Sequence, residues 1–255
     1  MGAEALVFLT LELRDGIALL GLNRPERANA YHQPLLLELR AVLARLAEDP
    51  RTRALVLHAG PCSHFCAGAD RDELEGRSAE DGPALLARRV FDELARWPRP
   101  TVAALRGAAL GGGLELALAC DVRLAGEDSR FGFPETSLGL IPAAGGSFRA
   151  PRLLGERLAR EMILFGRELD AWEALDRGLV SEVAPPGDVL GRALAWAAQA
   201  AARHPLATSL AKQALALSCP PGGALEFEGA AQAALYALRR VPDPEPTPSR
   251  EEPPR

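Results

Sequence analysis

Two glutamates stand in otherwise apolar stretches of the sequence. Glu115 lies in GAALGGGLELALACD (residues 107–121), and Glu135 is the one acid of FGFPETSLGLIP (131–142). A buried, unpaired carboxylate costs several kcal/mol, so each glutamate needs either a neutralising partner or a task. Two carboxylates in apolar surroundings can hold and activate a water, because one accepts a proton while the other donates one. The alternative is that Glu115 only caps its own helix or pairs with an arginine.

The glycines before Glu115 indicate a site for negative charge. Gly107 and Gly111 to Gly113 separate an apolar strand from an apolar helix. Residues without side chains let a ligand approach the backbone, and the first N–H groups of a helix have no internal partner. The phosphate-binding patterns GxGxxG and GK[ST] are absent, which favours an oxyanion site over a phosphate site. The Ala-Gly-Ala turn of HFCAGAD (64–70) is placed to supply a second N–H.

Hydrophobic spacing predicts the elements that must position these residues. Alternating residues from Val7 to Leu13, a turn at 14–16 and a second strand at Ile17–Leu22 predict a hairpin. Buried strands are expected at Ala54–His58, Thr101–Leu105 and Asp121–Ala125, and helices at 34–49, Pro83–Trp97, Glu156–Phe165, Ala171–Arg177, Asp188–Ala202, Pro205–Leu217 and Leu225–Arg240, besides the Glu115 helix. Strand–helix alternation followed by helices alone predicts one α/β core with a helical C-terminal section.

Composition excludes several classes of protein. The chain has 255 residues, 48% of them hydrophobic and 25% charged, as in ordinary globular proteins. A net charge of −5 argues against a nucleic-acid partner. The four cysteines lack disulfide spacing, and we expect no signal peptide and no membrane segment, so a cytoplasmic location is favoured. His58, Cys62, His64 and Cys66 match no common zinc pattern, and no metal is expected.

At its glycine- and glutamate-bearing motifs the sequence resembles the crotonase superfamily, the enoyl-CoA hydratase/isomerase family. The matching segments are LNRPERANA (22–30), HFCAGAD (64–70), GAALGGGLELALACD (107–121) and FGFPETSLGLIPAAGG (131–146), within a likeness that covers residues 5–218. The resemblance implies a crotonase-like spiral of strand-strand-helix repeats. Residues 1–186 would form this core with the active site, 187–241 a helical section that builds homotrimers or dimers of trimers, and 242–255 a disordered tail.

The resemblance also assigns roles to individual residues. Glu115 and Glu135 align with the two catalytic acids of the hydratases, and the backbone N–H groups of Ala69 and Gly112 would hold the thioester oxygen. Further contacts to substrate and coenzyme A are implied at Arg27, Ala28, Ala30, Ala67, Gly68, Asp70, Gly111, Pro134 and Gly139.

The implied activity is that of an enoyl-CoA hydratase, a lyase that adds water across the double bond of a trans-2-enoyl-CoA thioester in fatty-acid or related acyl-CoA metabolism. No cofactor is expected, because coenzyme A is part of the substrate, and neither are nucleic-acid or membrane partners. The alternatives are another crotonase chemistry, such as an isomerase or a biosynthetic dehydratase, and a non-catalytic acyl-CoA-binding or scaffold relative. Two acids favour hydration, because isomerases of the family commonly keep only the second.

The sequence departs from the family pattern at several positions. Asp72 stands where a basic residue near the coenzyme is frequent, Ala143 where Gly is usual, and Ser147-Phe148 where Thr-Gln is usual. We expect the last two changes to alter the floor of the acyl pocket. The C-terminus lacks the ending that reaches the coenzyme of a neighbouring subunit. Arg149 and Arg152 are candidates for phosphate contacts or for pairing on a helix surface.

Overall fold

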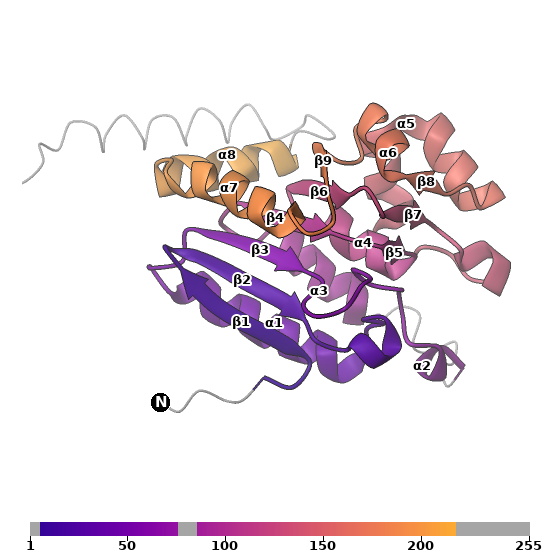
Figure 1. Cartoon of the computed structure of the whole chain (residues 1–255), viewed down its shortest axis with the longest axis horizontal. Helices are drawn as coiled ribbons and strands as arrows, with labels where there is room; N and C mark the ends of the chain where they lie inside the picture. Colours follow the sequence, from indigo (N-terminus) through magenta and orange to yellow (C-terminus); the bar gives the residue numbers. More distant parts are fainter. Residues whose placement is uncertain (1–5, 76–85, 218–255) are drawn as a thin grey trace, which may run out of the picture. The chain divides into compact units, whose positions relative to one another are not determined.

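The larger of two sheets begins at the expected hairpin in the computed structural model, which describes residues 6–75 and 86–217 (Figure 1). Strands β1 (Leu9–Arg14) and β2 (Ile17–Leu22) pair antiparallel. Their turn consists of Asp15 and Gly16, both at positive φ, as a two-residue hairpin loop requires. All of β2 is buried while β1 is largely exposed, so β1 forms the edge of the sheet.

The other strands of this six-stranded sheet run parallel to β2. They are β3 (Ala54–His58), β4 (Thr101–Leu105), β6 (Val122–Gly126) and β9 (Glu182–Ala184), in the order β1-β2-β3-β4-β6-β9. The expected bounds of β3 and β4 are confirmed, and β6 begins one residue later than expected. Short apolar runs gave a clear signal for β3 and β4 because parallel strands are covered on both faces.

A second, smaller sheet follows the first. Its strands β5 (Ala108–Leu110), β7 (Arg130–Gly132) and β8 (Leu169–Asp170) were not predicted, because two or three residues are too few for a periodic pattern. Cys66, after β3, bridges to Ala109 of β5, which pairs with Phe131 of β7. The chain thus passes repeatedly from the large sheet to the small one and then into a helix. This is the expected strand-strand-helix spiral.

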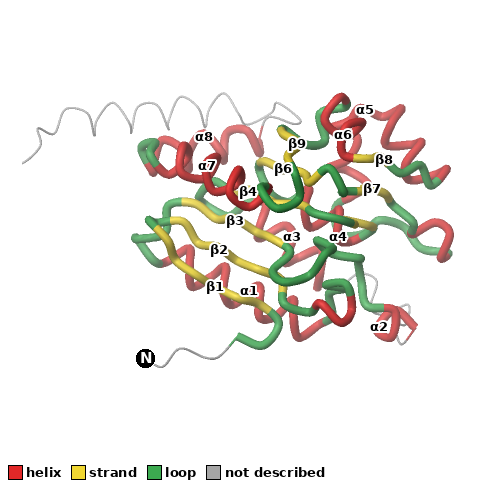
Figure 2. Tube along the Cα trace, viewed as in Figure 1, coloured by secondary structure: helices red, strands yellow, loops and turns green. Residues whose placement is uncertain are grey.

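Helices cover both faces of the large sheet (Figures 1 and 2). Helices α1 (Gln33–Glu48) and α3 (Leu86–Ala95) share one hydrophobic core with Leu55 and Leu57 of β3. Val56, between these leucines, points the other way and packs in a second core with Ala193 and Ala197 of α7 (Val189–Ala201). Because side chains alternate along a strand, successive residues of β3 pack into two different cores.

The structure describes seven further helical segments. They are the short helices η1 (Pro25–Arg27) and η3 (Glu135–Leu138), and α2 (Arg71–Glu75), α4 (Gly112–Leu118), α5 (Gly146–Phe165), α6 (Ala171–Asp176) and α8 (Pro205–Leu217). Helix α5 is interrupted at Gly155, whose φ of 78° is not helical. The expected helix Glu156–Phe165 is its second half, and the first half was not predicted.

The chain divides into two units, Met1–Ser209 and Leu210–Arg255. Helix α7 lies beyond the boundary expected at residue 187 but belongs to the first unit. The oligomerisation role of 187–241 stays a prediction, and Leu225–Arg240 and 242–255 lie outside the described residues. Within the described ranges, no helix has the length and apolarity that a membrane span requires.

Candidate active site

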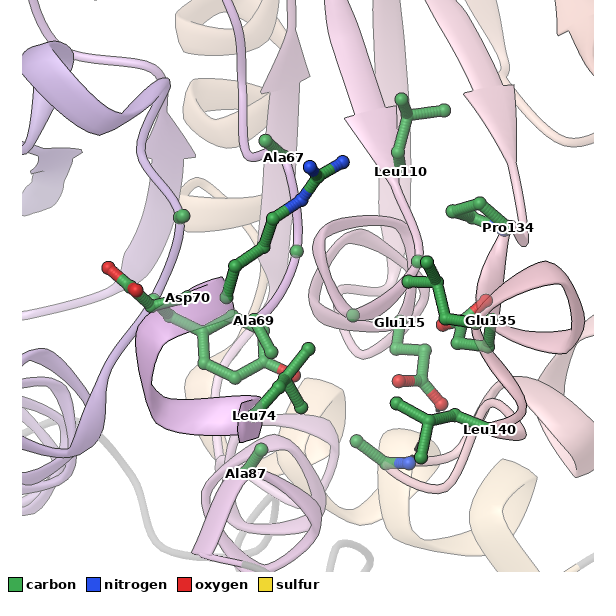
Figure 3. Close-up of a pocket in the computed structure, with 18 of the residues that line it drawn as sticks. Ala67, Ala69, Asp70, Leu74, Ala87, Leu110, Glu115, Pro134, Glu135 and Leu140 are labelled. Carbon is green, nitrogen blue, oxygen red and sulfur yellow. Dashed lines mark hydrogen bonds between the residues drawn. The ribbon is translucent and has the colours of Figure 1, made fainter. Parts of the chain in front are cut away.

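A cavity of about 880 Å³ lies in the first unit, where the segments after β2, β3, β5 and β7 meet (Figure 3). Eleven predicted site residues line it: Arg27, Ala30, Ala67, Gly68, Ala69, Asp70, Gly111, Gly112, Glu115, Pro134 and Glu135. The spiral explains this gathering, because each turn brings one of the sequence motifs to the same end of the sheets.

Two predicted contact residues, Ala28 and Gly139, are not among the residues that line the cavity. Ala28 has a left-handed conformation, and its carbonyl accepts a 3.0 Å hydrogen bond from the amide of Ala67. Gly139 ends η3 at a φ of 71° and donates to the carbonyl of Thr136. Both residues shape the backbone of a lining segment.

The three glycines before Glu115 are each needed for a different reason. Gly111 has φ 52° and ψ −126°, a conformation that favours glycine, and a Cβ there would lie 2.9 Å from Oε1 of Glu135. A Cβ on Gly112 would collide with the Tyr31 ring and hydroxyl, and one on Gly113 with the carbonyl of Cys66. The glycine run therefore packs the start of α4 against the segments that follow β2 and β3.

The amides of Ala69 and Gly112 are brought together at the cavity. Cys66 pairs in parallel with Ala109, so the segment from Ala67 to Ala69 runs beside Leu110 to Gly112. A Cβ on Gly68 would stand 3.5 Å from the nitrogen of Gly112. Among the described residues, neither amide has a hydrogen-bond acceptor. Two neighbouring, unused N–H groups can stabilise a developing negative charge.

Glu115 is buried, with 2% of its surface exposed, and its carboxylate is held by backbone amides. Oε1 accepts hydrogen bonds from the N–H groups of Ala144 (2.8 Å) and Gly146 (2.7 Å). Burial raises the pKa of Glu115, while these two amides and the charge of Arg149 oppose the rise. The carboxylate is therefore fixed in place without being neutralised by a direct ion pair.

Glu135 reaches the same cavity from η3 (Figure 3). Its Oε2 is buried and has no hydrogen-bond partner among the described residues. Burial, reinforced by the charge of Glu115, raises the pKa of Glu135 to about 7. The two glutamates thus differ, because the amides of Ala144 and Gly146 stabilise the charged form of Glu115, whereas among the described residues only its own backbone amide does so for Glu135. Such a difference suits one carboxyl to accept a proton and the other to donate one.

Comparisons with known proteins agree with this geometry. A model of the enoyl-CoA hydratase/isomerase family matches residues 12–232. The chain belongs to the enoyl-CoA hydratase/isomerase family. It is 42% identical over 233 residues to the enoyl-CoA isomerase/hydratase fer4 of Mycosarcoma maydis, covering 85% of this chain and 84% of that protein.

Two further proteins to which the chain is similar are named enoyl-CoA hydratases. The short-chain-enoyl-CoA hydratase of Clostridium acetobutylicum is 35% identical over 225 residues, covering 87% of this chain and 86% of that one. The crystal structure of an enoyl-CoA hydratase from Bacillus anthracis superposes with a TM-score of 0.86 at 35% identity, covering 91% and 92% of the two chains. The resemblance and the crotonase-like fold expected from the sequence are confirmed.

In this hydratase/isomerase family member Asp70 has a structural partner. Its Oδ2 accepts a 2.5 Å hydrogen bond from Nη1 of Arg24, which also donates to the carbonyl of Ala30. The two side chains are 5% and 12% exposed. Figure 3 shows the Asp70 carboxylate directed away from the two glutamates. Asp70 therefore ties the segments after β2 and β3 together at the edge of the cavity.

Arg27 lies at the rim of the cavity and is half-exposed. Its guanidinium pairs with the carboxylate of Asp72 at 3.1 Å. Asp72 is the residue that stands where relatives often have a basic residue. Because both side chains are exposed, this pair contributes little to stability. The departure at Asp72 thus places an acid beside the predicted coenzyme contact.

Sequence reasoning missed most of the apolar lining. Tyr31, Leu74, Ala87, Leu110, Leu138, Leu140, Ile141, Ala143 and Ala144 also border the cavity. An apolar letter in a loop carries no signal that separates a pocket wall from the core. Only Ala143, at a position where the family usually has glycine, was marked by the sequence.

The two histidines of the cluster, one at the end of β3 and one in the loop that follows, accept hydrogen bonds from backbone amides. His64 Nδ1 accepts from the amide of Ala108, and His58 Nδ1 from that of Gly60. Burial raises the pKa of the Cys66 thiol to about 12. Within the part of the chain that the structure describes, no group of three or more His, Cys, Asp or Glu is arranged to hold a metal.

Proposed function

We propose that this enzyme is an enoyl-CoA hydratase that adds water across the double bond of a trans-2-enoyl-CoA thioester. The observation that carries the proposal is the convergence of two unlike carboxyl groups, Glu115 and Glu135, on the cavity that also contains the free amides of Ala69 and Gly112. The names of the relatives in Clostridium acetobutylicum and Bacillus anthracis support it.

In this mechanism the thioester oxygen accepts hydrogen bonds from the N–H groups of Ala69 and Gly112. Negative charge moves onto this oxygen as water attacks the β carbon. The amides hold that charge in place without reorganising, and a donor of this kind typically lowers a barrier by about 3–4 kcal/mol.

The two glutamates divide the proton transfers. Ionised Glu115 takes a proton from the water as the water oxygen bonds to the β carbon. The π electrons of the double bond move to the enolate, and protonated Glu135 delivers its proton to the α carbon. The product is a 3-hydroxyacyl thioester, and proton exchange with solvent returns both groups to their starting states.

The rest of the cavity suits an apolar acyl chain attached to a charged carrier. Leu74, Ala87 and Leu140 contribute apolar walls, whereas Arg27 and Arg71 contribute cationic side chains. We place the acyl group against the apolar walls and the coenzyme A phosphates near the two arginines. The proposed reaction needs no separate cofactor, because coenzyme A is part of the substrate.

A double-bond shift between 3-enoyl and 2-enoyl thioesters is the second candidate. The raised pKa of Glu135, about 7, suits one group to remove a proton at one carbon and return it at another. The name of the fer4 relative includes both activities. Isomerisation would need Glu135 and the two amides but not Glu115.

One experiment tests the proposal and separates the two reactions. Hydration of crotonyl-CoA and isomerisation of a 3-enoyl-CoA are measured for the wild type, Glu115→Gln and Glu135→Gln. Hydration is expected to fall by at least about 100-fold in both variants. Near-normal hydration in either variant would remove that residue from the mechanism. A wild type that isomerises but does not hydrate would favour the second candidate.

A further inference from the structure

An arginine behind the cavity connects α3 with the segment that holds Glu115. Arg149 lies in the first turn of α5, and 11% of its side chain is exposed. Its Nη1 donates to the carbonyl of Ala144 at 3.1 Å, and its Nη2 donates to Oδ1 of Asp92, on α3, at 3.0 Å. One nitrogen of the guanidinium is therefore anchored on α3, and the other holds the carbonyl of Ala144 in the loop before α5.

The segment that Arg149 holds is the one that holds Glu115. The N–H groups of Ala144 and Gly146 donate to the same carboxylate oxygen, at 2.8 and 2.7 Å. Gly145, between them, has a φ of 123°, and a Cβ there would collide with the Arg149 guanidinium. The turn formed by residues 144–146 thus contacts Arg149 on one side and Glu115 on the other.

Charge reinforces the geometry. Arg149 from α5 is the charged group that lowers the pKa of Glu115, and the charge of Glu115 in turn raises the pKa of Glu135 on η3. Arg149 is in turn influenced by Asp92, Arg96 and Arg152, and the other charged side chains that line the cavity are Arg27, Asp70 and Arg71. The charge of Arg149 therefore favours the ionised form of Glu115.

We propose that Arg149 is a positioning residue for hydration: anchored by Asp92, it holds the carbonyl of Ala144, and the N–H groups of Ala144 and Gly146 in the same turn aim the Glu115 carboxylate into the cavity. The inference rests on the proposed function, in which Glu115 takes the proton of water. Without the guanidinium, the turn at Gly145 can relax, and Glu115 loses both its orientation and a nearby cation.

The test compares Arg149→Met, Arg149→Lys and the control Arg160→Met, which removes an exposed arginine from the same helix, where it pairs with Glu156. With crotonyl-CoA, Arg149→Met should lower kcat about 10- to 100-fold and change KM by less than about twofold, because orientation is lost and not binding. The acid limb of its kcat/KM profile should move to higher pH. Arg149→Lys should restore part of both effects, and Arg160→Met should behave as the wild type.

A double-mutant cycle separates positioning from general structural damage. If Arg149 acts through Glu115, Arg149→Met should cost little in a Glu115→Gln background, measured in single turnovers with excess enzyme. An equal loss in both backgrounds, or an unmoved acid limb, would overturn the proposal. Failure of the proposed function would appear separately, as no hydration by the wild type. If the wild type does not hydrate, a crystal structure of Arg149→Met still tests whether Arg149 positions Glu115. Unchanged hydrogen bonds between Glu115 and the amides of Ala144 and Gly146 would then overturn the proposal.

Discussion

The amide of Gly146, at the first residue of α5, donates a 2.7 Å hydrogen bond to Oε1 of Glu115 on α4. A Cβ on Gly146 would stand 3.1 Å from that same oxygen, so the close approach depends on the absence of a side chain. This contact makes Glu115 the better stabilised of the two carboxylates. The difference between Glu115 and Glu135 has consequences for the pH dependence of both activity and stability.

The kcat/KM for hydration of crotonyl-CoA should fall on both sides of an optimum below or near neutrality. Glu135 must be protonated, so activity should decline as the pH rises through its pKa of about 7. Glu115 must be ionised, and its pKa is raised by burial, so activity should also decline toward acid pH. Steady-state assays from pH 5 to 9 check this expectation. A flat profile between pH 6 and 9 would contradict the assigned roles.

Glu135 should destabilise the folded protein at alkaline pH. Because its folded pKa is raised from 4.5 to about 7, the folded state binds this proton more tightly, and stability is lost as the pH rises through that interval. Allowing for partial exposure, Glu135→Gln should raise the free energy of unfolding by about 1–2 kcal/mol at pH 8 and by much less at pH 5. Urea denaturation at both values measures the difference.

The control for this effect is Glu127→Gln, which replaces an exposed acid that does not line the cavity. It should change stability by less than about 0.5 kcal/mol at either pH. A Glu135→Gln variant with the same stability as the wild type at pH 8 would mean that the carboxylate is solvated in the folded protein.

Gly112→Ala should impair both folding and catalysis. The new methyl group would collide with the Tyr31 ring, which is buried against Phe91, so the start of α4 must shift and carry the Gly112 amide with it. We expect a loss of about 1–3 kcal/mol in stability and of at least about tenfold in kcat. Thermal unfolding and crotonyl-CoA turnover measure the two effects.

Gly191→Ala is the matched control for that variant. Gly191 lies inside α7, and a Cβ there meets nothing within 4 Å. Alanine is the better helix former, so this change should stabilise the protein by about 0.5–1 kcal/mol and leave kcat unaltered. If both glycine variants behaved alike, the packing of Gly112 against Tyr31 would not matter.

The elements that sequence reasoning located are those whose local pattern agrees with their final environment. Strands β3 and β4 are continuous apolar runs, and Asp15-Gly16 is a turn that local conformation alone specifies. Strands β5, β7 and β8 form only because successive turns of the spiral place them side by side, and no window of two or three residues records that pairing.

The residues of the candidate site also fall into those that the local sequence could reveal and those that it could not. Glu115, Glu135 and the glycines were conspicuous because their residue types conflict with their apolar surroundings. The partners of Glu115 are backbone amides of Ala144 and Gly146, which any residue could supply, so the sequence contains no sign of them. Arg149 was recognisable as a candidate, but its position between Asp92 and the Ala144 carbonyl depends on how α3 and α5 pack.

The buried pair Arg24–Asp70 should contribute far more to stability than the exposed pair Arg27–Asp72 a few residues away. Burial alone would raise the pKa of Asp70, but the hydrogen bond and charge of Arg24, together with the hydrogen bond from the amide of Asp72, outweigh it and lower the pKa below 3.8. Asp70→Asn leaves Arg24 buried without its counter-charge and should cost about 3 kcal/mol at pH 7. Asp72→Asn should cost less than about 1 kcal/mol, because both partners face solvent.

The pH dependence gives this prediction a second measurement. A lowered carboxyl pKa contributes stability above the unfolded value of 3.8, and that contribution is lost as the pH falls through the folded value. The difference between wild type and Asp70→Asn should therefore persist from pH 7 down to about pH 5 and shrink in stronger acid. Equal costs for Asp70→Asn and Asp72→Asn at pH 7 would show that Arg24 is solvated. In that case Asp70 would be available to a ligand, as the sequence suggested, instead of tying two segments together.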